Sequence, residues 1–438
     1  MREKNMNTQP YKGSRDFYPE DKRLQKWLFA KWAEVCEKFG YEQYDAPMLE
    51  ETALYQLKGS DEILSEQTYT FIDRGDRSVT MRTEMTPSVS RMVAQKRQEL
   101  AYPLRWYSIP ELWRYERPQR GRLRQFWQLN VDIFGVQGQY AEHEIISVAD
   151  AIMQSVGAKR SMYQIKLNSR LFIDFVLKDY LGLDEVESAT IRRLVDKMAK
   201  IDPAAFAASI EASMSPTARD NGAPAKLLDL LQLKSLDDMP ADVAGHPSIA
   251  ELKQLMALLK TNGITNTVFD ISLMRGFDYY TDIVFEVFDT NPDNNRSMFG
   301  GGRYDGLVGL FGVDPVPTVG FGMGDVTFVN FLEVHGLMPA LESETELYMA
   351  FIGDMYSSVQ PVLAELREEG VTVAVDTTGR KLDKQIKTAE KKGIEFVVFV
   401  GEQEIQTGQF RIKNLKSGEE QTLSLARLIT VVKDRRKK

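Results

Sequence analysis

Two kinds of hydrophobic spacing alternate along the chain. Over residues 22–39 apolar side chains recur every three or four positions, which predicts an amphipathic helix that Gly40 can end. Residues 41–46 then have the pattern of a short strand that stops at Pro47. A long helix that leads into a strand often builds a subunit interface, and the pattern fits a simple core helix equally well.

Strand-like segments dominate the next part of the chain and are separated by charged turns. They cover residues 67–72, 78–82, 104–109, 111–117 and 126–134. This pattern predicts a mostly antiparallel sheet.

From residue 169 to residue 262 the chain is rich in Ala, Leu and Lys and has a helical pattern. Strand-like runs return at residues 268–273, 283–289 and 319–324. We therefore expect an α+β domain over residues 1–338, with residues 170–262 as a helical insertion within it.

The C-terminal part alternates between strands and helices. We expect strands at residues 347–352, 371–375 and 396–400, a helix that ends near residue 369, and a second helix at residues 382–392. Such alternation predicts a small α/β domain over residues 345–438, with a mixed or parallel sheet.

Composition limits the kinds of site the chain can build. Of 438 residues, 43% are hydrophobic and 27% are charged, as in soluble globular proteins. Cys36 is the only cysteine and there are three histidines, which excludes an internal disulfide and a thiolate-rich metal site. A polar N-terminus and the lack of a long apolar run predict a cytoplasmic protein without a membrane span. With a net charge of −8, binding to nucleic acid would need local basic patches.

An arginine-rich segment between two strand-like runs is the densest chemical signal. Five arginines fall within eleven positions: Arg114, Arg117, Arg120, Arg122 and Arg124. Charge runs are usually solvated surface. Here the flanking strands predict a long hairpin whose guanidinium groups suit phosphate oxygens, so we expect a polyanion to bind.

Polar residues elsewhere could converge on the same cavity. Gln128 and Asp132 lie four positions apart on the returning strand and therefore share one face of it. Both can point into the same cavity as Arg114 on the outgoing strand. Glu84 adds an acid beside the hydroxyl of Thr86. Acids for an ammonium group and a guanidinium for a carboxylate or phosphate would suit a zwitterionic substrate.

Two further motifs contain glycine and tyrosine. Residues 275–280 combine Arg275 with Tyr279 and Tyr280 before a strand, although tyrosines at such positions are usually packing residues. The glycines at 300–302 predict a bulge or a close approach to a ligand. No helix follows them as a phosphate-binding loop would require.

Taken together, these segments resemble the class II aminoacyl-tRNA synthetases and, within them, the histidyl-tRNA synthetase family. The resemblance covers most of the chain. It rests on the opening Lys12-Gly-Ser-Arg-Asp16, the helix ending near Pro47 as motif 1, Arg114-Tyr-Glu-Arg-Pro-Gln119 with Gly121-Arg-Leu-Arg-Gln-Phe126 as motif 2, the histidine-specific Arg275-Gly-Phe-Asp-Tyr-Tyr280 and Gly301-Gly-Arg-Tyr-Asp-Gly306, and the C-terminal Gly379-Arg-Lys-Leu-Asp-Lys-Gln-Ile386 and Phe396-Val-Val-Phe-Val-Gly401 of an anticodon-binding domain.

The resemblance implies a homodimer that activates L-histidine with ATP and Mg²⁺ and transfers it to its tRNA, without a tightly bound cofactor or a metal site built by the protein alone. Arg114 and Arg275 would be catalytic, with Arg275 acting as a cation at the α-phosphate. The remaining roles that it implies are histidine binding by Glu84, Met85, Thr86, Gln128, Asp132, Tyr279 and Tyr280, ATP binding by Arg114, Glu116, Arg122 and Tyr304, and tRNA contacts by Arg117 and Gln119.

Three positions depart from the family pattern. Thr327 stands where motif 3 normally carries an arginine that packs on adenine and touches the γ-phosphate. Asp132 replaces a glutamate, and residues 82–86 read Arg-Thr-Glu-Met-Thr instead of Arg-Pro-Glu-Gly-Thr. The missing arginine favours a second reading, a non-catalytic paralogue that acts as regulatory subunit of an ATP phosphoribosyltransferase. That paralogue generally lacks the anticodon-binding domain, which favours the synthetase.

Overall fold

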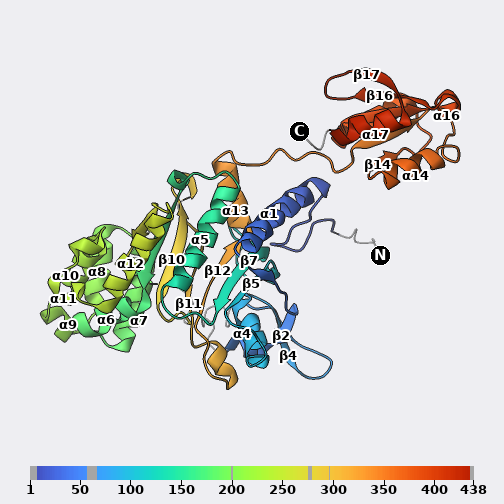
Figure 1. Ribbon diagram of the computed structural model, residues 1–438. Helices are drawn as coiled ribbons and strands as arrows, with labels where there is room; N and C mark the ends of the chain where they lie inside the picture. The colour runs from blue at the N-terminus through green and yellow to red at the C-terminus, as the bar shows by residue number, and fades with distance from the viewer. Residues whose placement is uncertain (1–6, 57–66, 199–200, 275–278, 295, 435–438) are drawn as a thin grey trace, which may run out of the picture. The chain divides into compact units, whose positions relative to one another are not determined.

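The computed structural model describes residues 7–56, 67–198, 201–274, 279–294 and 296–434. The chain divides into two compact units, Met1–Met338 and Pro339–Lys438 (Figure 1). No helix in the described ranges combines the length and the apolar character needed to cross a membrane.

The first unit is built on a nine-stranded sheet in the order β1-β5-β7-β12-β11-β10-β8-β9, with β6 paired to β7, and a small sheet β2-β4-β3. All pairs are antiparallel except β1 with β5 and β8 with β9. The strands are β1 (Glu42–Gln43), β2 (Leu49–Glu51), β3 (Thr70–Ile72), β4 (Ser78–Met81), β5 (Leu104–Ser108), β6 (Glu111–Trp113), β7 (Gln125–Phe134), β8 (Tyr163–Ser169), β9 (Thr267–Phe269), β10 (Ile283–Asp289), β11 (Ser297–Arg303) and β12 (Thr318–Gly324). The predicted α+β class with a mostly antiparallel sheet is confirmed.

Helices α1, α5 and α13 pack on one face of the large sheet (Figure 1). A group of mostly short helices lies between β8 and β9 in the sequence. The helices of the unit are α1 (Pro19–Lys38), α2 (Thr52–Gln56), α4 (Thr86–Gln95), α5 (Tyr140–Ser155), α6 (Arg170–Phe175), α7 (Glu185–Asp196), α8 (Pro203–Ala212), α9 (Pro216–Asp220), α10 (Ala223–Gln232), α11 (Ala241–Ala244), α12 (Pro247–Thr261) and α13 (Asp325–Val334).

Helix α1 follows the pattern that predicted it. Pro19 occupies its first turn with two acids, where a missing N–H costs nothing and negative charge faces the positive end of the helix dipole. Leu28 and Trp32 bury its apolar face in the core, and the helix ends before Gly40, whose φ of 80° suits glycine.

The second unit has a five-stranded sheet in the order β14-β13-β15-β16-β17. Strand β13 runs parallel to its two neighbours, and the last two strands are antiparallel, so the predicted mixed α/β domain is confirmed. Its elements are β13 (Leu347–Phe351), α14 (Gln360–Glu368), β14 (Val373–Val375), α15 (Leu382–Lys391), β15 (Phe396–Val400), α16 (Glu402–Thr407), β16 (Gln409–Asn414), β17 (Glu420–Ser424) and α17 (Leu425–Asp434).

Several strands are shorter than predicted. The strand expected at residues 111–117 ends at Trp113, and beyond it only isolated bonds such as Arg114 N–H to the Arg124 carbonyl (2.9 Å) continue the hairpin. Pro118, which has no N–H to donate, lies in this stretch. Residues 268–273 also leave the sheet early, because Asp270 accepts a hydrogen bond from the Ser272 N–H (2.9 Å) and turns the chain.

The predicted bulge at residues 300–302 is wrong, because all three glycines pair regularly on both sides within β11. The irregularity of this ladder falls between Val287 and Phe288. The second expectation for these glycines, close approach to a ligand, remains a prediction.

A buried ion pair ties the end of β11 to α5. The Arg303 Nε and Nη2 groups donate to the two oxygens of Glu142 at 2.6 and 2.8 Å, and Nη2 also donates to the Gly138 carbonyl at 2.9 Å. The two side chains are 6% and 3% exposed. With both charges desolvated, loss of one partner leaves the other uncompensated.

We therefore predict that Glu142→Gln lowers the free energy of unfolding of the first unit by about 3 kcal/mol. All five tryptophans lie in this unit, so urea unfolding of the full chain followed by tryptophan fluorescence reports on it. Glu34→Gln, which removes an exposed partner of Lys38, should leave the transition unchanged. Equal effects of the two substitutions would contradict the prediction.

Candidate active site

Strand β7 carries the polar side chains around which the candidate site forms. Its side chains alternate, so Leu129 and Val131 enter the core while Gln128, Asn130 and Asp132 face the other side of the sheet. The prediction that Gln128 and Asp132 share one face is confirmed.

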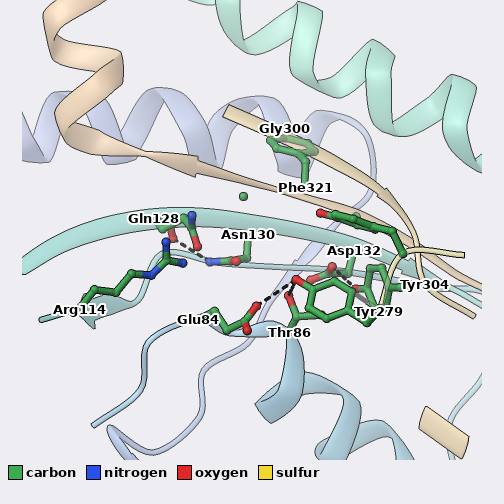
Figure 2. Close-up of a pocket in the computed structure, with 13 residues that line it drawn as sticks. Glu84, Thr86, Arg114, Gln128, Asn130, Asp132, Tyr279, Gly300, Tyr304 and Phe321 are labelled. Carbon is green, nitrogen blue, oxygen red and sulfur yellow. Dashed lines mark hydrogen bonds between the residues drawn. The ribbon is translucent and has the colours of Figure 1, made fainter. Parts of the chain in front are cut away.

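These side chains open onto a pocket on the sheet (Figure 2). Arg114 and Gln128 lie toward one end of the pocket, and Asp132 and Tyr304 lie toward the other. The pocket is lined by Glu84, Thr86, Arg114, Gln128, Asn130, Asp132, Tyr279, Tyr280, Gly300, Tyr304, Gly320, Phe321 and Gly322.

Glycines on β12 leave room for the polar side chains of β7. Gly320 pairs with Asp132, and a Cβ atom at Gly320 would lie 2.0 Å from Asp132 Oδ1. A Cβ atom at Gly322 would lie 2.8 Å from Gln128 Nε2. Any larger residue at either position would displace a polar group of the pocket.

The arginine end of the pocket combines a cation with a buried acid. Arg114 Nε donates to the Thr83 carbonyl (2.9 Å), and its guanidinium lies 5.3 Å from the centre of the Phe126 ring. The Tyr279 hydroxyl donates to Glu84 Oε2 at 3.0 Å. Burial raises the pKa of Glu84, and Arg114 and Tyr279 partly offset that rise. This end can hold an ammonium group and an anion side by side.

The opposite end is formed by Asp132 and tyrosines. The Tyr304 hydroxyl donates to Asp132 Oδ1. Burial raises the pKa of Asp132 to about 7, against the opposing effects of Tyr304 and Tyr44. The rings of Tyr279 and Tyr280 lie 5.0 Å apart, and those of Tyr279 and Tyr304 lie 5.6 Å apart. An aromatic wall with a buried carboxylate suits a flat ring that donates an N–H group.

The arginine-rich hairpin extends beyond this pocket. Arg122 Nη1 bonds to Glu116 Oε2 at 3.1 Å and its side chain is 60% exposed. The backbones of Gln119 and Arg122 pair with each other. The described pocket is thus not lined by the four hairpin residues Glu116, Arg117, Gln119 and Arg122.

Three other predicted residues need separate comment. Met85 is fully buried and does not line the described pocket, so its side chain is part of the packing beneath the site. Tyr304, expected to bind ATP, lines the pocket and donates its hydroxyl to Asp132, and its role in ATP binding stays a prediction. Arg275 falls within residues 275–278, outside the described residues.

Sequence reasoning missed several residues of the pocket. Asn130 and Phe321 were not singled out, although the parity of β7 identifies Asn130 once Gln128 and Asp132 are placed. Glu286 of β10 does not line the pocket itself but pairs with Gly300, which does. Its Cγ lies 2.9 Å from where a Cβ of that glycine would be, and burial raises the pKa of its carboxyl to about 7.

Within the ranges that the structure describes, no group of three or more His, Cys, Asp or Glu side chains is arranged to hold a metal ion. The geometry favours noncovalent chemistry, in which charged groups orient a substrate and stabilise developing charge.

Comparisons with known proteins agree on one family. A model described as "Histidyl-tRNA synthetase" matches residues 13–325, and one described as "Anticodon binding domain" matches residues 349–435. A histidine–tRNA ligase of Leptospira biflexa is 41% identical over 438 residues, 99% of each chain. A chloroplastic/mitochondrial histidine–tRNA ligase of Arabidopsis thaliana is 38% identical over 97% of this chain and 87% of its own. The crystal structure of a histidyl-tRNA synthetase from Nostoc has a TM-score of 0.82 at 21% identity and covers 98% of this chain and 100% of its own.

The raised pKa of Asp132 predicts a stability cost at neutral pH. Because the folded-state pKa is about 7, above the usual aspartate pKa of about 3.8, the folded state loses stability as pH rises from about 4 to 7. Asp132→Asn should therefore raise the free energy of unfolding by roughly 1–4 kcal/mol at pH 8 and by little at pH 4.5. Urea unfolding at both pH values measures this, with the exposed Asp229→Asn as control. A gain of the same size at both pH values would contradict the prediction.

Proposed function

The chain belongs to the histidyl-tRNA synthetase family, and from that premise we propose how its pocket performs the histidine–tRNA ligase reaction. The enzyme activates histidine with ATP and joins it to the 3′ end of its tRNA. The observation that carries the proposal is the placement of Arg114 at one end of a glycine-floored pocket and of Asp132 at the other.

Histidine would span this pocket. Its ammonium group would bind Glu84, Thr86 and Gln128, and its imidazole would lie between Asp132 and Tyr280. The Tyr279 hydroxyl, bonded to Glu84, would orient that acid. Recognition of ring nitrogens by buried polar groups discriminates strongly, because an analogue without those nitrogens leaves the groups unpaired.

ATP, entering with Mg²⁺, would place its α-phosphate at Arg114 and Arg275. The histidine carboxylate then attacks the α-phosphorus, the bond to pyrophosphate breaks, and histidyl-adenylate forms. Next, the terminal ribose hydroxyl of the tRNA attacks the histidyl carbonyl and AMP leaves. Positioning and charge stabilisation carry both steps.

A different cation would serve the γ-phosphate in this chain. Thr327 donates its hydroxyl to the Met298 carbonyl (2.8 Å), and its Cγ2 lies 3.5 Å from where a Cβ of Gly121 would be. The tip of the arginine-rich hairpin therefore packs against the position of the missing arginine. Exposed Arg122, paired with Glu116 on that hairpin, is our candidate for that cation.

Arg117 and Gln119 would contact the acceptor end of the tRNA from the same hairpin. The second unit, which matches the anticodon-binding model, would bind the anticodon.

We further propose a homodimer that works in the cytoplasm, where a chain whose one cysteine is buried needs no oxidising environment. The comparisons do not favour the regulatory-subunit alternative, since relatives named as ligases match the chain over its whole length.

We predict histidine-dependent exchange of pyrophosphate into ATP by the purified full-length enzyme. Arg275→Ala should slow this exchange by about 100- to 1000-fold, because the cation that neutralises charge developing on the α-phosphate as pyrophosphate leaves is lost. The matched control is Arg219→Ala, at an exposed position in the helical insertion, which should leave the rate unchanged. Exchange that proceeds equally well without histidine would contradict the proposed function, and circular dichroism verifies that each variant is folded.

A further inference from the structure

The carboxylate of Asp132 sits unusually close to its own sheet. It is one methylene shorter than the glutamate of the family pattern, and its Oδ1 is so near β12 that only glycine fits opposite. Tyr304 bonds to this same oxygen from the chain that follows β11. A second contact would be needed to hold the carboxylate from the other side.

Tyr44 approaches Asp132 from that other side. Its backbone N–H donates to the Tyr107 carbonyl (2.9 Å), which places it directly after β1 at the edge of the sheet. Its ring lies 5.6 Å from that of Trp106, and Trp106 pairs directly with Asp132 in the β5–β7 ladder. The Tyr44 side chain thus lies over Trp106 and extends towards Asp132.

The Tyr44 hydroxyl is buried and is not at full hydrogen-bond geometry with any group in the described ranges. It is nevertheless close enough to Asp132 to lower the pKa of that carboxyl, while the hydroxyl of Ser108 lies beside it. Because a buried donor without a full bond is costly, a hydrogen bond to Asp132 would stabilise this hydroxyl.

We propose that Tyr44 is a positioning residue for histidine recognition, which together with Tyr304 holds the Asp132 carboxylate from two sides and aims it at the imidazole. The inference rests on the proposed function. Around this carboxylate the titratable neighbours are Tyr44, Tyr280 and Tyr304, and the charges of Asp45 and Arg82 act on Tyr44.

The test is Tyr44→Phe in the full-length enzyme, assayed by histidine-dependent pyrophosphate exchange between pH 5.5 and 9. Without the hydroxyl, the ionised form of Asp132 loses a stabilising partner. We expect the acid limb of kcat/KM for histidine to move up by about one pH unit and the KM for histidine at pH 7 to rise about tenfold. The kcat and the KM for ATP should stay within about twofold of the unaltered enzyme.

Two further variants separate positioning from general packing. Tyr107→Phe removes a hydroxyl that donates to Glu37 on the opposite face of the same sheet, so it should not move the pH profile. In an Asp132→Asn background, Tyr44→Phe should have no further effect on that profile, because there is no carboxylate to orient.

An unchanged acid limb in Tyr44→Phe overturns the inference, as does an equal rise in the KM values for histidine and ATP. Either result leaves the proposed function standing if the unaltered enzyme exchanges pyrophosphate in a histidine-dependent way. Absence of that exchange in the unaltered enzyme overturns the proposed function and this inference with it.

Discussion

The pocket depends on the lack of side chains along the centre of the large sheet. A polar side chain on a sheet face normally competes for space with those of the neighbouring strands, about 5 Å away. Gly320 and Gly322 of β12 remove that competition, so Asp132 and Gln128 can lie almost on the backbone of the next strand. Gly300 continues the open floor on β11. A surface that would otherwise be a packed sheet face becomes an open pocket.

The pocket also depends on the position of the strands that carry its side chains. Ionic contacts hold the end of β11 and the start of α13 in place. The Arg303–Glu142 pair anchors the end of β11 to α5, directly before Tyr304 and its bond to Asp132. On the same helix-covered face, Asp325 at the start of α13 accepts from Arg15 Nη2 (2.7 Å) and from the Trp127 backbone N–H (3.0 Å). Trp127 precedes Gln128 on β7. Arg303 of the glycine-rich signature therefore stabilises the fold, and the next residue, Tyr304, contacts Asp132 in the pocket.

The sequence predicted the parts of the site that depend on short-range periodicity. Strand parity placed Gln128 and Asp132 together, and resemblance to a known family brought Glu84 and Arg114 to the same cavity. Sequence reasoning did not identify Met85 as buried, because Met85 directly precedes α4 and its burial depends on contacts made in the folded chain.

Contacts between strands far apart in the sequence were also beyond pattern reasoning. Tyr44 lies over its neighbour Trp106 only because a two-residue strand aligns in parallel with β5. The length of β6 was overestimated for a related reason. Charged residues after Trp113 continue a strand-like alternation, yet only scattered bonds pair them with the returning chain.

The order of strands along the chain also determines when the large sheet can be completed during translation. Strand β7 holds the amide and acid of the pocket, but its partner β12 lies roughly 190 residues later in the sequence. At about 5–20 residues per second, a ribosome needs on the order of 10–40 s to supply it. Until then the polar edge of β7 has no glycine strand to cover it, and β10 and β11 are also still unmade. A nascent chain of this protein therefore has an incomplete central sheet until β10, β11 and β12 have been synthesised.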